Sequence, residues 1–159
     1  MRFRRLTLPE LEPLEQEFKH FLGVNGLPAE EWALIKQTNP ERTEQLLDNF
    51  SDMILERSLK NIKTVEFRTS DKWYVFRYDD LEATCILLES DAPETVNLLE
   101  TPLETLFATA ETIEHLSVAR LKKSHKKNRE DELFALLNNG GTIAKNELFD
   151  QFSHLDPTI

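Results

Sequence analysis

The chain has 159 residues, 40% of them hydrophobic, and a formal net charge of −10. This length is typical of a single domain, 1–159, that buries a sizeable core. The negative charge repels polyanions and therefore argues against a general binder of nucleic acid or of anionic membranes.

Cysteine usage and hydropathy indicate the compartment. The one cysteine, Cys85, has no partner for a disulfide or a zinc site, which fits a reducing cytoplasm. No stretch approaches the roughly 18 apolar residues that a membrane span requires. We therefore expect a cytoplasmic protein without a membrane segment or an export signal.

Three helices are predicted in the first part of the chain. A capping box, T-L-P-E, followed by apolar residues at helical spacing predicts a helix over 8–22. A proline followed by two glutamates predicts a second helix over 28–37. An Asn-Pro pair predicts the start of a third, whose apolar stripe extends over 40–61.

Residues 64–89 are the part of the chain that predicts β structure. Three runs rich in β-branched and aromatic residues, separated by Ser-Asp and Asp-Asp pairs, predict a three-stranded antiparallel meander. Alternation places Tyr74, Phe76 and Tyr78 on one face. A sheet this small is stable only when other elements pack on it. We expect an α+β fold in which the N-terminal helices, chiefly 40–61, and a C-terminal helical segment cover the sheet.

Three more helices are predicted after the sheet. Residues 90–100 are interpreted as a loop, although a fourth strand there is left open. A Thr-Pro-Leu-Glu start signal predicts a helix over 102–121. An acidic first turn and an Asn-Gly-Gly stop predict one over 129–138, and a short last helix is expected over 145–152. The last two resemble a helix-turn-helix, but the second carries acidic residues, so we favour a hairpin packed on the core.

The strongest local anomaly is a basic cluster at 120–129 in an otherwise acidic chain. The candidate nucleic-acid-binding residues of this cluster are all cationic: Arg120, Lys122, Lys123, Lys126, Lys127 and Arg129. Such a cluster predicts RNA phosphate contacts with a steep salt dependence. We favour the plainer interpretation of a solvated face or an internal partner for acidic residues, because no aromatic residue interleaves the cluster.

No other pattern indicates chemistry. Glu17 and His20 have the Glu-x-x-His spacing of di-iron helices, but no second copy of this motif accompanies them. Cys85 lies in a predicted strand with no recognisable base beside it. The aromatic face of the meander is interpreted as core rather than as a platform for stacking bases. We therefore predict no catalytic residue, no metal ligand and no cofactor.

Two N-terminal segments resemble a known family. The opening M-R-F-R-R-L-T is followed some fifteen residues on by F-L-G-V-N-G, and E-L-F at 147–149 lies near the end. These segments resemble those of an uncharacterised family of small bacterial proteins. The resemblance implies no activity and no site residues. It does give the hypothesis that Arg2, Arg4, Arg5 and Asn25 do more than fill a surface.

The leading functional prediction is a non-enzymatic protein-interaction or scaffold module that docks a protein partner or a second copy. It is based on the lack of a catalytic constellation and on the segregation of charge into an acidic body and one basic segment. One alternative is an RNA-associated protein that binds through 120–129. A second alternative is an enzyme with an unrecognised site.

Overall fold

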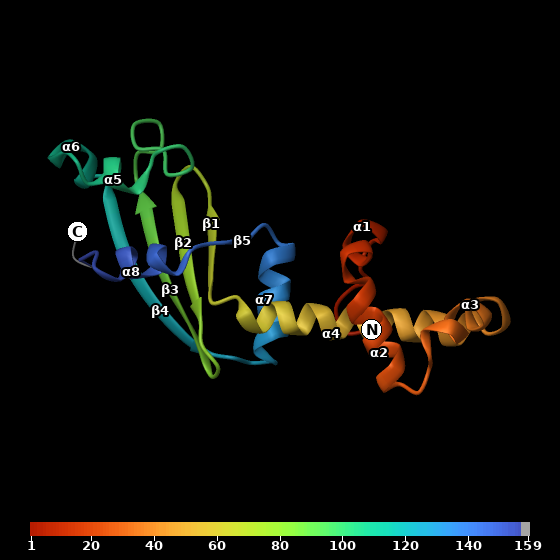
Figure 1. The fold of residues 1–159 in the computed structure, drawn as a ribbon. Helices are drawn as coiled ribbons and strands as arrows, with labels where there is room; N and C mark the ends of the chain where they lie inside the picture. The colour runs from red at the N-terminus through yellow and green to blue at the C-terminus, as the bar shows by residue number, and fades with distance from the viewer. Residues whose placement is uncertain (157–159) are drawn as a thin grey trace. The chain divides into compact units, whose positions relative to one another are not determined.

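The computed structural model describes residues 1–156 (Figure 1). The chain divides into two compact units, Met1–Leu59 and Lys60–Ile159. Two expectations concern the arrangement of these units and stay predictions: a single domain, and a sheet covered by the N-terminal helices. Within the described residues, no helix combines the length and the apolar character needed to cross a bilayer.

The first unit is built from helices. Its elements are α1 (Leu8–Leu11), the 3₁₀ turn η1 (Glu12–Leu14), α2 (Glu15–Val24), α3 (Ala29–Thr38) and α4 (Pro40–Asn61). Pro13 lies in η1, which interrupts the helix predicted over 8–22. The interruption follows from proline, which lacks the N–H that a regular helix interior requires. The other two helices lie where the capping signals predict them.

The core of this unit is a cluster of aromatic rings. Phe18 contacts Trp32 and Phe50 edge to face, with ring centroids 5.0 and 4.9 Å apart. Phe50 is fully buried. Edge-to-face pairs add about 0.5–1.5 kcal/mol beyond the burial of their area. The helices of the first unit therefore pack around Phe50 of α4.

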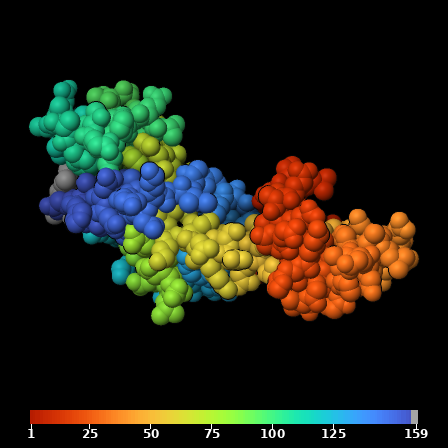
Figure 2. Space-filling view, viewed as in Figure 1, coloured from red at the N-terminus to blue at the C-terminus, as the bar shows by residue number. Residues whose placement is uncertain are grey.

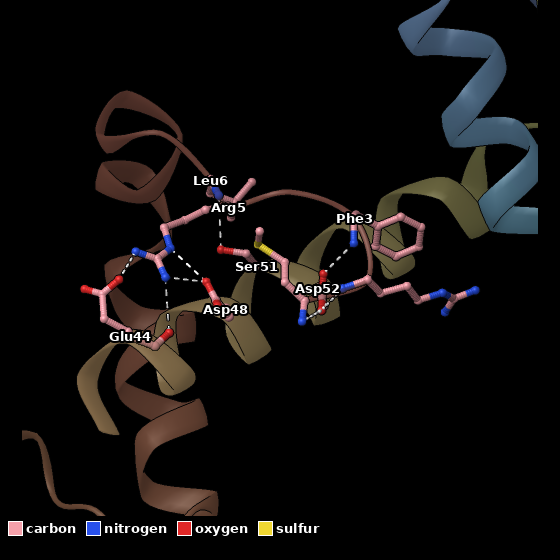
Figure 3. Close-up of polar contacts among 9 residues, drawn as sticks. Phe3, Arg5, Leu6, Glu44, Asp48, Ser51 and Asp52 are labelled. Atoms are coloured by element: carbon pink, nitrogen blue, oxygen red, sulfur yellow. Dashed lines mark hydrogen bonds and ion pairs between the residues drawn. The ribbon is translucent and has the colours of Figure 1, made fainter. Parts of the chain in front are cut away.

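The basic N-terminal segment is bound to α4 (Figure 3). Three carboxylates of α4, each one helical turn from the next, face this segment: Glu44, Asp48 and Asp52. Arg5 donates through Nε to Asp48 at 2.8 Å and also pairs with the first of the three. Asp52 accepts the backbone N–H groups of Arg2 and Phe3 at 2.6 and 2.9 Å. The opening residues are therefore part of the packed first unit.

The second unit contains a five-stranded antiparallel sheet with the strand order β4-β3-β2-β1-β5 (Figure 1). The strands are β1 (Thr64–Arg68), β2 (Lys72–Tyr78), β3 (Glu82–Ser90), β4 (Leu116–Ser124) and β5 (Thr142–Ile143). The first three form the predicted meander, and the α+β class is confirmed. The prediction of three strands was wrong, because one further strand lies at each edge.

The prediction of a helix over 102–121 was also wrong. Its start signal does open a helix, but only α5 (Leu103–Leu106) follows, and after α6 (Ala110–Ile113) the chain becomes β4. Leu116 and Val118 are buried while the residue between them is exposed, a period of two rather than 3.6. Pairing with β3 along the whole strand outweighs the local helix signal.

Two helices follow β4 at the predicted positions, α7 (Arg129–Asn138) and α8 (Asn146–Ser153). α8 packs against β2 and β3, and the blue C-terminal part of the chain lies over the face of the sheet toward the viewer (Figure 2). Phe152 is fully buried and meets Trp73 edge to face, with ring centroids 5.0 Å apart. The C-terminal helical segment therefore packs on the sheet as predicted.

The face of the sheet under α8 is not the aromatic face expected from the sequence. The strand residues buried in this core alternate along the strands: Trp73, Val75, Ile86, Leu88, Leu116 and Val118. Tyr74 and Phe76 point to the opposite face and are half-buried, whereas Tyr78 is buried. The interpretation of all three rings as core was thus only correct for Tyr78. Leu116 and Val118 of β4, where a helix was predicted, complete the core on the face of the sheet under α8.

Candidate functional site

β4 is an edge strand of nine residues. Two hydrogen bonds bracket its pairing with β3, from Asp91 N to His115 O and from His125 N to Leu81 O. In an antiparallel pair, successive residues alternate between facing the partner strand and facing away from it. The register therefore leaves these residues with backbone N–H and C=O groups on the free side: Leu116, Val118, Arg120, Lys122 and Ser124.

The free side of β4 has no backbone partner among residues 1–156. Every side chain from Ala119 to Ser124 is exposed. An edge strand of this length presents a row of unpaired donors and acceptors that another strand can pair with. The free side of β4, from Leu116 to Ser124, is called the open edge below.

Two of the predicted cationic residues line the open edge on the face of α8. Arg120 donates through Nη2 to the carbonyl oxygens of Ser153, the last residue of α8, and of Leu155, just beyond it. Lys122 pairs with Glu82 of β3 at 2.9 Å, and this bond raises the pKa of Lys122. Exposed pairs of this kind contribute only about 0–1 kcal/mol, so a competing carboxylate can replace them.

Glu132 of α7 bonds to several residues of the basic loop that follows β4. Its carboxylate accepts the N–H groups of Lys126 and Lys127 at 2.8 and 3.3 Å and pairs with Lys123 at 3.2 Å. Its distance to His125 Nδ1 is 3.3 Å. Burial works to raise the pKa of Glu132, but these bonds outweigh burial and lower the pKa to about 2. Part of the basic cluster therefore bonds within the protein, to the carboxylate of Glu132.

Arg129 differs from the other five cationic candidates because it is buried. It donates to the main-chain carbonyl of Tyr78 at 3.1 Å and to that of Ile62, and it pairs with Glu130 at 3.3 Å. These bonds tie the start of α7 to the end of β2. The structure thus brings three exposed candidates together on β4, two in the loop after it, and one into the interior. Nucleic-acid binding by the six stays a prediction.

A row of rings crosses the face of the sheet opposite α8. Tyr74 and Phe76 stack with centroids 6.1 Å apart, and Tyr78 stacks on His125 at 5.7 Å. The first two rings line an open hollow of about 450 Å³. The rest of its lining comes from β3 and β4: Ala83, Cys85, Leu121, Lys122 and Lys123. Because β4 forms one wall of the hollow, a strand added at the open edge would extend that wall.

Cys85 lies half-buried in this hollow, and burial raises the pKa of its thiol to about 11. A thiol with so high a pKa is almost entirely protonated at neutral pH and is a weak nucleophile. No histidine is among the described residues that line the hollow. The hollow is therefore suited to contact with an apolar group and does not activate Cys85 for covalent chemistry.

A protein family described as "Family of unknown function (DUF6495)" matches residues 1–156. The chain belongs to this family. No curated protein and no solved structure matches the chain. The prediction that the chain belongs to an uncharacterised family is thereby confirmed. Because the DUF6495 description states no activity, the function of this member has to be argued from its geometry.

The N-terminal residues singled out by the resemblance make internal bonds in this DUF6495 protein. Arg4 pairs with Glu10 at 2.7 Å, and this bond, together with bonds from Thr7, lowers the pKa of Glu10 to about 2. Asn25 donates through Nδ2 to the carbonyl oxygen of Phe21 at 2.8 Å, which closes the end of α2. With the Arg5 contacts to α4, these bonds give Arg4, Arg5 and Asn25 a role in the first unit's own stability.

The Glu-x-x-His pair of the DUF6495 chain lines a hollow of about 540 Å³ in the first unit. Glu17 and His20 border it together with apolar residues of α2 and α4, among them Phe21, Val24 and Met53. Within residues 1–156, no group of three or more His, Cys, Asp or Glu side chains is arranged to hold a metal ion. This hollow offers apolar contact and too few ligands for a metal.

The cations of the open edge were predicted from the sequence, but the strand that carries them was not. The signal was present in L-S-V-A-R-L at 116–121, where apolar residues alternate with small or polar ones before the pattern breaks. Lysines at the end of such a run are typical of edge strands. Those two features together would have predicted an exposed strand in place of the end of a helix.

Proposed function

We propose that this protein is an interaction module that accepts an extended polypeptide segment as an additional strand along β4. The observation that carries the proposal is the row of outward backbone groups of the open edge, with which no described residue pairs. Main-chain hydrogen bonds to an exposed edge supply affinity, and pockets for alternate side chains supply specificity. The hollow beside Leu121 is such a pocket.

The arrangement favours a polypeptide over RNA as the partner. An RNA strand has no backbone pattern that pairs with a sheet edge, whereas an extended peptide does. Two of the cations, Lys122 and Lys123, already pair with Glu82 and Glu132. Those carboxylates and the net charge of −10 weaken the attraction for phosphate. RNA binding through 120–129 remains the alternative, supported by the five exposed cations.

The variant Lys122→Pro tests strand addition directly. Proline removes an N–H that points away from β3, and edge strands tolerate proline when its nitrogen faces solvent. The matched control is Lys122→Ala, which removes the same side chain but keeps the N–H. The probes are labelled, end-capped peptides of about ten residues, the length of a typical long strand. Valine alternates in them with glutamate, glutamine or lysine.

We expect at least one of these peptides to bind the natural protein and Lys122→Ala, and to bind Lys122→Pro more than about tenfold more weakly. N-methylation of the peptide gives a second test that leaves the protein unchanged. Methyl groups on one edge of the extended peptide should block binding, and methyl groups on the other edge should not. Equal binding to both protein variants, or equal effects of both methylation patterns, would contradict strand addition.

Labelled single-stranded RNA, titrated at two salt concentrations, tests the alternative. The relevant charge reversal changes four exposed lysines to glutamate: Lys122, Lys123, Lys126 and Lys127. RNA affinity that collapses with salt, disappears on this reversal and persists in Lys122→Pro would favour the RNA function. In that case the peptide proposal would fail.

A further inference from the structure

We infer that the segment received by the open edge alternates acidic and apolar residues. Its carboxylates lie over Arg120 and Lys122, and the apolar side chain between them enters the hollow beside Leu121. This inference rests on the proposed function and specifies the chemistry of the partner.

The local charge of β4 is opposite to that of the whole protein. The strand Leu116–Ser124 contains three basic residues and no acidic residue. The whole chain, by contrast, has 29 Asp and Glu against 19 Lys and Arg. On neighbouring strands, residues of opposite charge that face each other stabilise the pairing, and residues of like charge destabilise it. The open edge therefore favours an acidic neighbour.

The side-chain faces of β4 set the order of residues in the partner. Arg120 and Lys122 share the face of Val118, which packs under α8, while Leu121 points to the opposite face. Residues directly opposite each other on adjacent strands share a face. The partner residues opposite the two cations therefore meet positive charge, and the residue between them meets the hollow.

Arg120 and Lys122 can each bind a carboxylate of the partner. The two bonds from Arg120 to Ser153 and Leu155, at and just after the end of α8, come from one terminal nitrogen, Nη2. The rest of the guanidinium fork makes no hydrogen bond within residues 1–156 and matches the geometry of a carboxylate. Lys122 is 66% exposed, so its pair with Glu82 is weak and a partner carboxylate can compete for it.

The hollow gives the partner's apolar residue a seat. Leu121 is 61% exposed and leaves apolar surface for a partner to cover. It stands beside the half-buried rings of Tyr74 and Phe76 in a space of about 450 Å³. An aromatic or branched side chain placed there would cover Leu121 and the ring faces. Apolar anchors in pockets of this kind carry much of the affinity of an interface.

The charges of β4 disfavour a second copy of the chain at the open edge. In the antiparallel two-fold register with the greatest overlap, Arg120 faces Arg120 of the second copy, with Lys122 diagonal to it. Basic residues on an edge strand oppose self-pairing in this way. The charges that disfavour a second copy therefore select for an acidic segment.

The three alternating peptides test the inference when their affinities are compared. For the natural protein, we expect the glutamate peptide to bind about tenfold more tightly than the glutamine peptide, and the lysine peptide to bind most weakly. The double variant Arg120→Glu with Lys122→Glu should reverse this order. The matched control, Lys126→Glu with Lys127→Glu, changes the charge equally outside the strand and should keep the order.

The outcomes separate this inference from the proposed function. If the glutamine or lysine peptide binds as tightly as the glutamate peptide, and Lys122→Pro still weakens binding, the inference is overturned and the proposed function stands. If no peptide binds, both are overturned. In the glutamate peptide, replacement of the valine opposite Leu121 by serine should weaken binding about tenfold. Unchanged affinity would overturn the hollow as the seat of the apolar residue.

Discussion

The two edges of the sheet differ in how far they are covered. At one edge, the two residues of β5, Thr142 and Ile143, pair with β1, and Ala144 N–H donates to Thr64 O at 3.0 Å. At the other edge, β4 has nine residues, and the outward backbone groups of five of them have no partner in the described part of the chain. Short edge strands protect a sheet, and long exposed ones invite pairing. The difference singles out β4 as the edge suited to a partner.

The covered edge depends on the turn before β5. Gly140 has a φ of +102°, a conformation that other residues rarely adopt. A Cβ added at Gly141 would lie 2.9 Å from the carbonyl oxygen of Leu136 and 3.0 Å from Val65. The glycine pair thus lets the chain leave α7 and approach β1 closely enough to cover it.

The largest expected effect comes from removing the anchor of α8, the helix that follows β5. Phe152→Ala should lower the free energy of unfolding by about 3–5 kcal/mol, because Phe152 is fully buried against Trp73. Leu121→Ala at the open edge is the matched control and should change stability by less than about 1 kcal/mol. Denaturant titration measures both. Equal losses would contradict the burial of Phe152 of α8 and the exposure of Leu121 at the open edge.

A second variant breaks the covered edge itself. Gly141→Ala should destabilise the protein by about 1–3 kcal/mol, because its Cβ would crowd Leu136 and Val65. It should also speed hydrogen exchange at Ala144 N–H, which bonds to Thr64. Gly23→Ala in α2 is the control, since nothing lies within 4 Å of its added Cβ. Unchanged exchange at Ala144 in Gly141→Ala would show that the turn does not hold β5.

A third prediction concerns the loop that follows the open edge. Its bonds lower the pKa of Glu132 from 4.5 to about 2, so their stabilisation is present above pH 4.5 and is lost as the pH falls from 4.5 to 2. Glu132→Gln should remove about 2 kcal/mol of stability at neutral pH and flatten this acid-dependent loss. The exposed Glu147→Gln is the control. An unaltered acid profile in Glu132→Gln would contradict the bonding of the loop.

The smallest expected effect comes from removing the carboxylate that pairs with Lys122 at the open edge. Glu82→Gln removes the partner of Lys122 and a negative charge beside the edge. We expect the glutamate peptide to bind this variant about threefold more tightly, with stability changed by less than about 0.5 kcal/mol. Fluorescence titration of the peptide measures the gain. Weaker binding would mean that Glu82, and not a partner's carboxylate, is the proper partner of Lys122.

Local signals predicted much of the fold. Caps, proline positions and period-two alternation lie within a few residues of the elements they define, so the meander and most helices were found from the sequence. β5 was not predicted, because two residues are too few to show a period in the sequence. β4 was not predicted, because its strand conformation depends on distant parts of the chain. These are β3, with which it pairs, and Phe152, which completes the core under it.

The candidate site was predictable only in part, for the same reason. The sequence pointed to the cations at 120–129 because their charge is a local property. It did not separate Arg129, which is buried, from Lys122, which is exposed. Nor did it show which backbone groups are unpaired, since that depends on the order of strands in the sheet.

Residue-resolved amide hydrogen exchange along β4 tests the central claim most directly. In the free protein, the N–H groups of Ala119 and Leu121, which face β3, should exchange slowly, and those of Arg120 and Lys122 should exchange fast. Saturation with the glutamate peptide should slow exchange at Arg120 and Lys122. Slow exchange at these two residues without peptide, or fast exchange with peptide bound, would contradict an open edge that receives a strand.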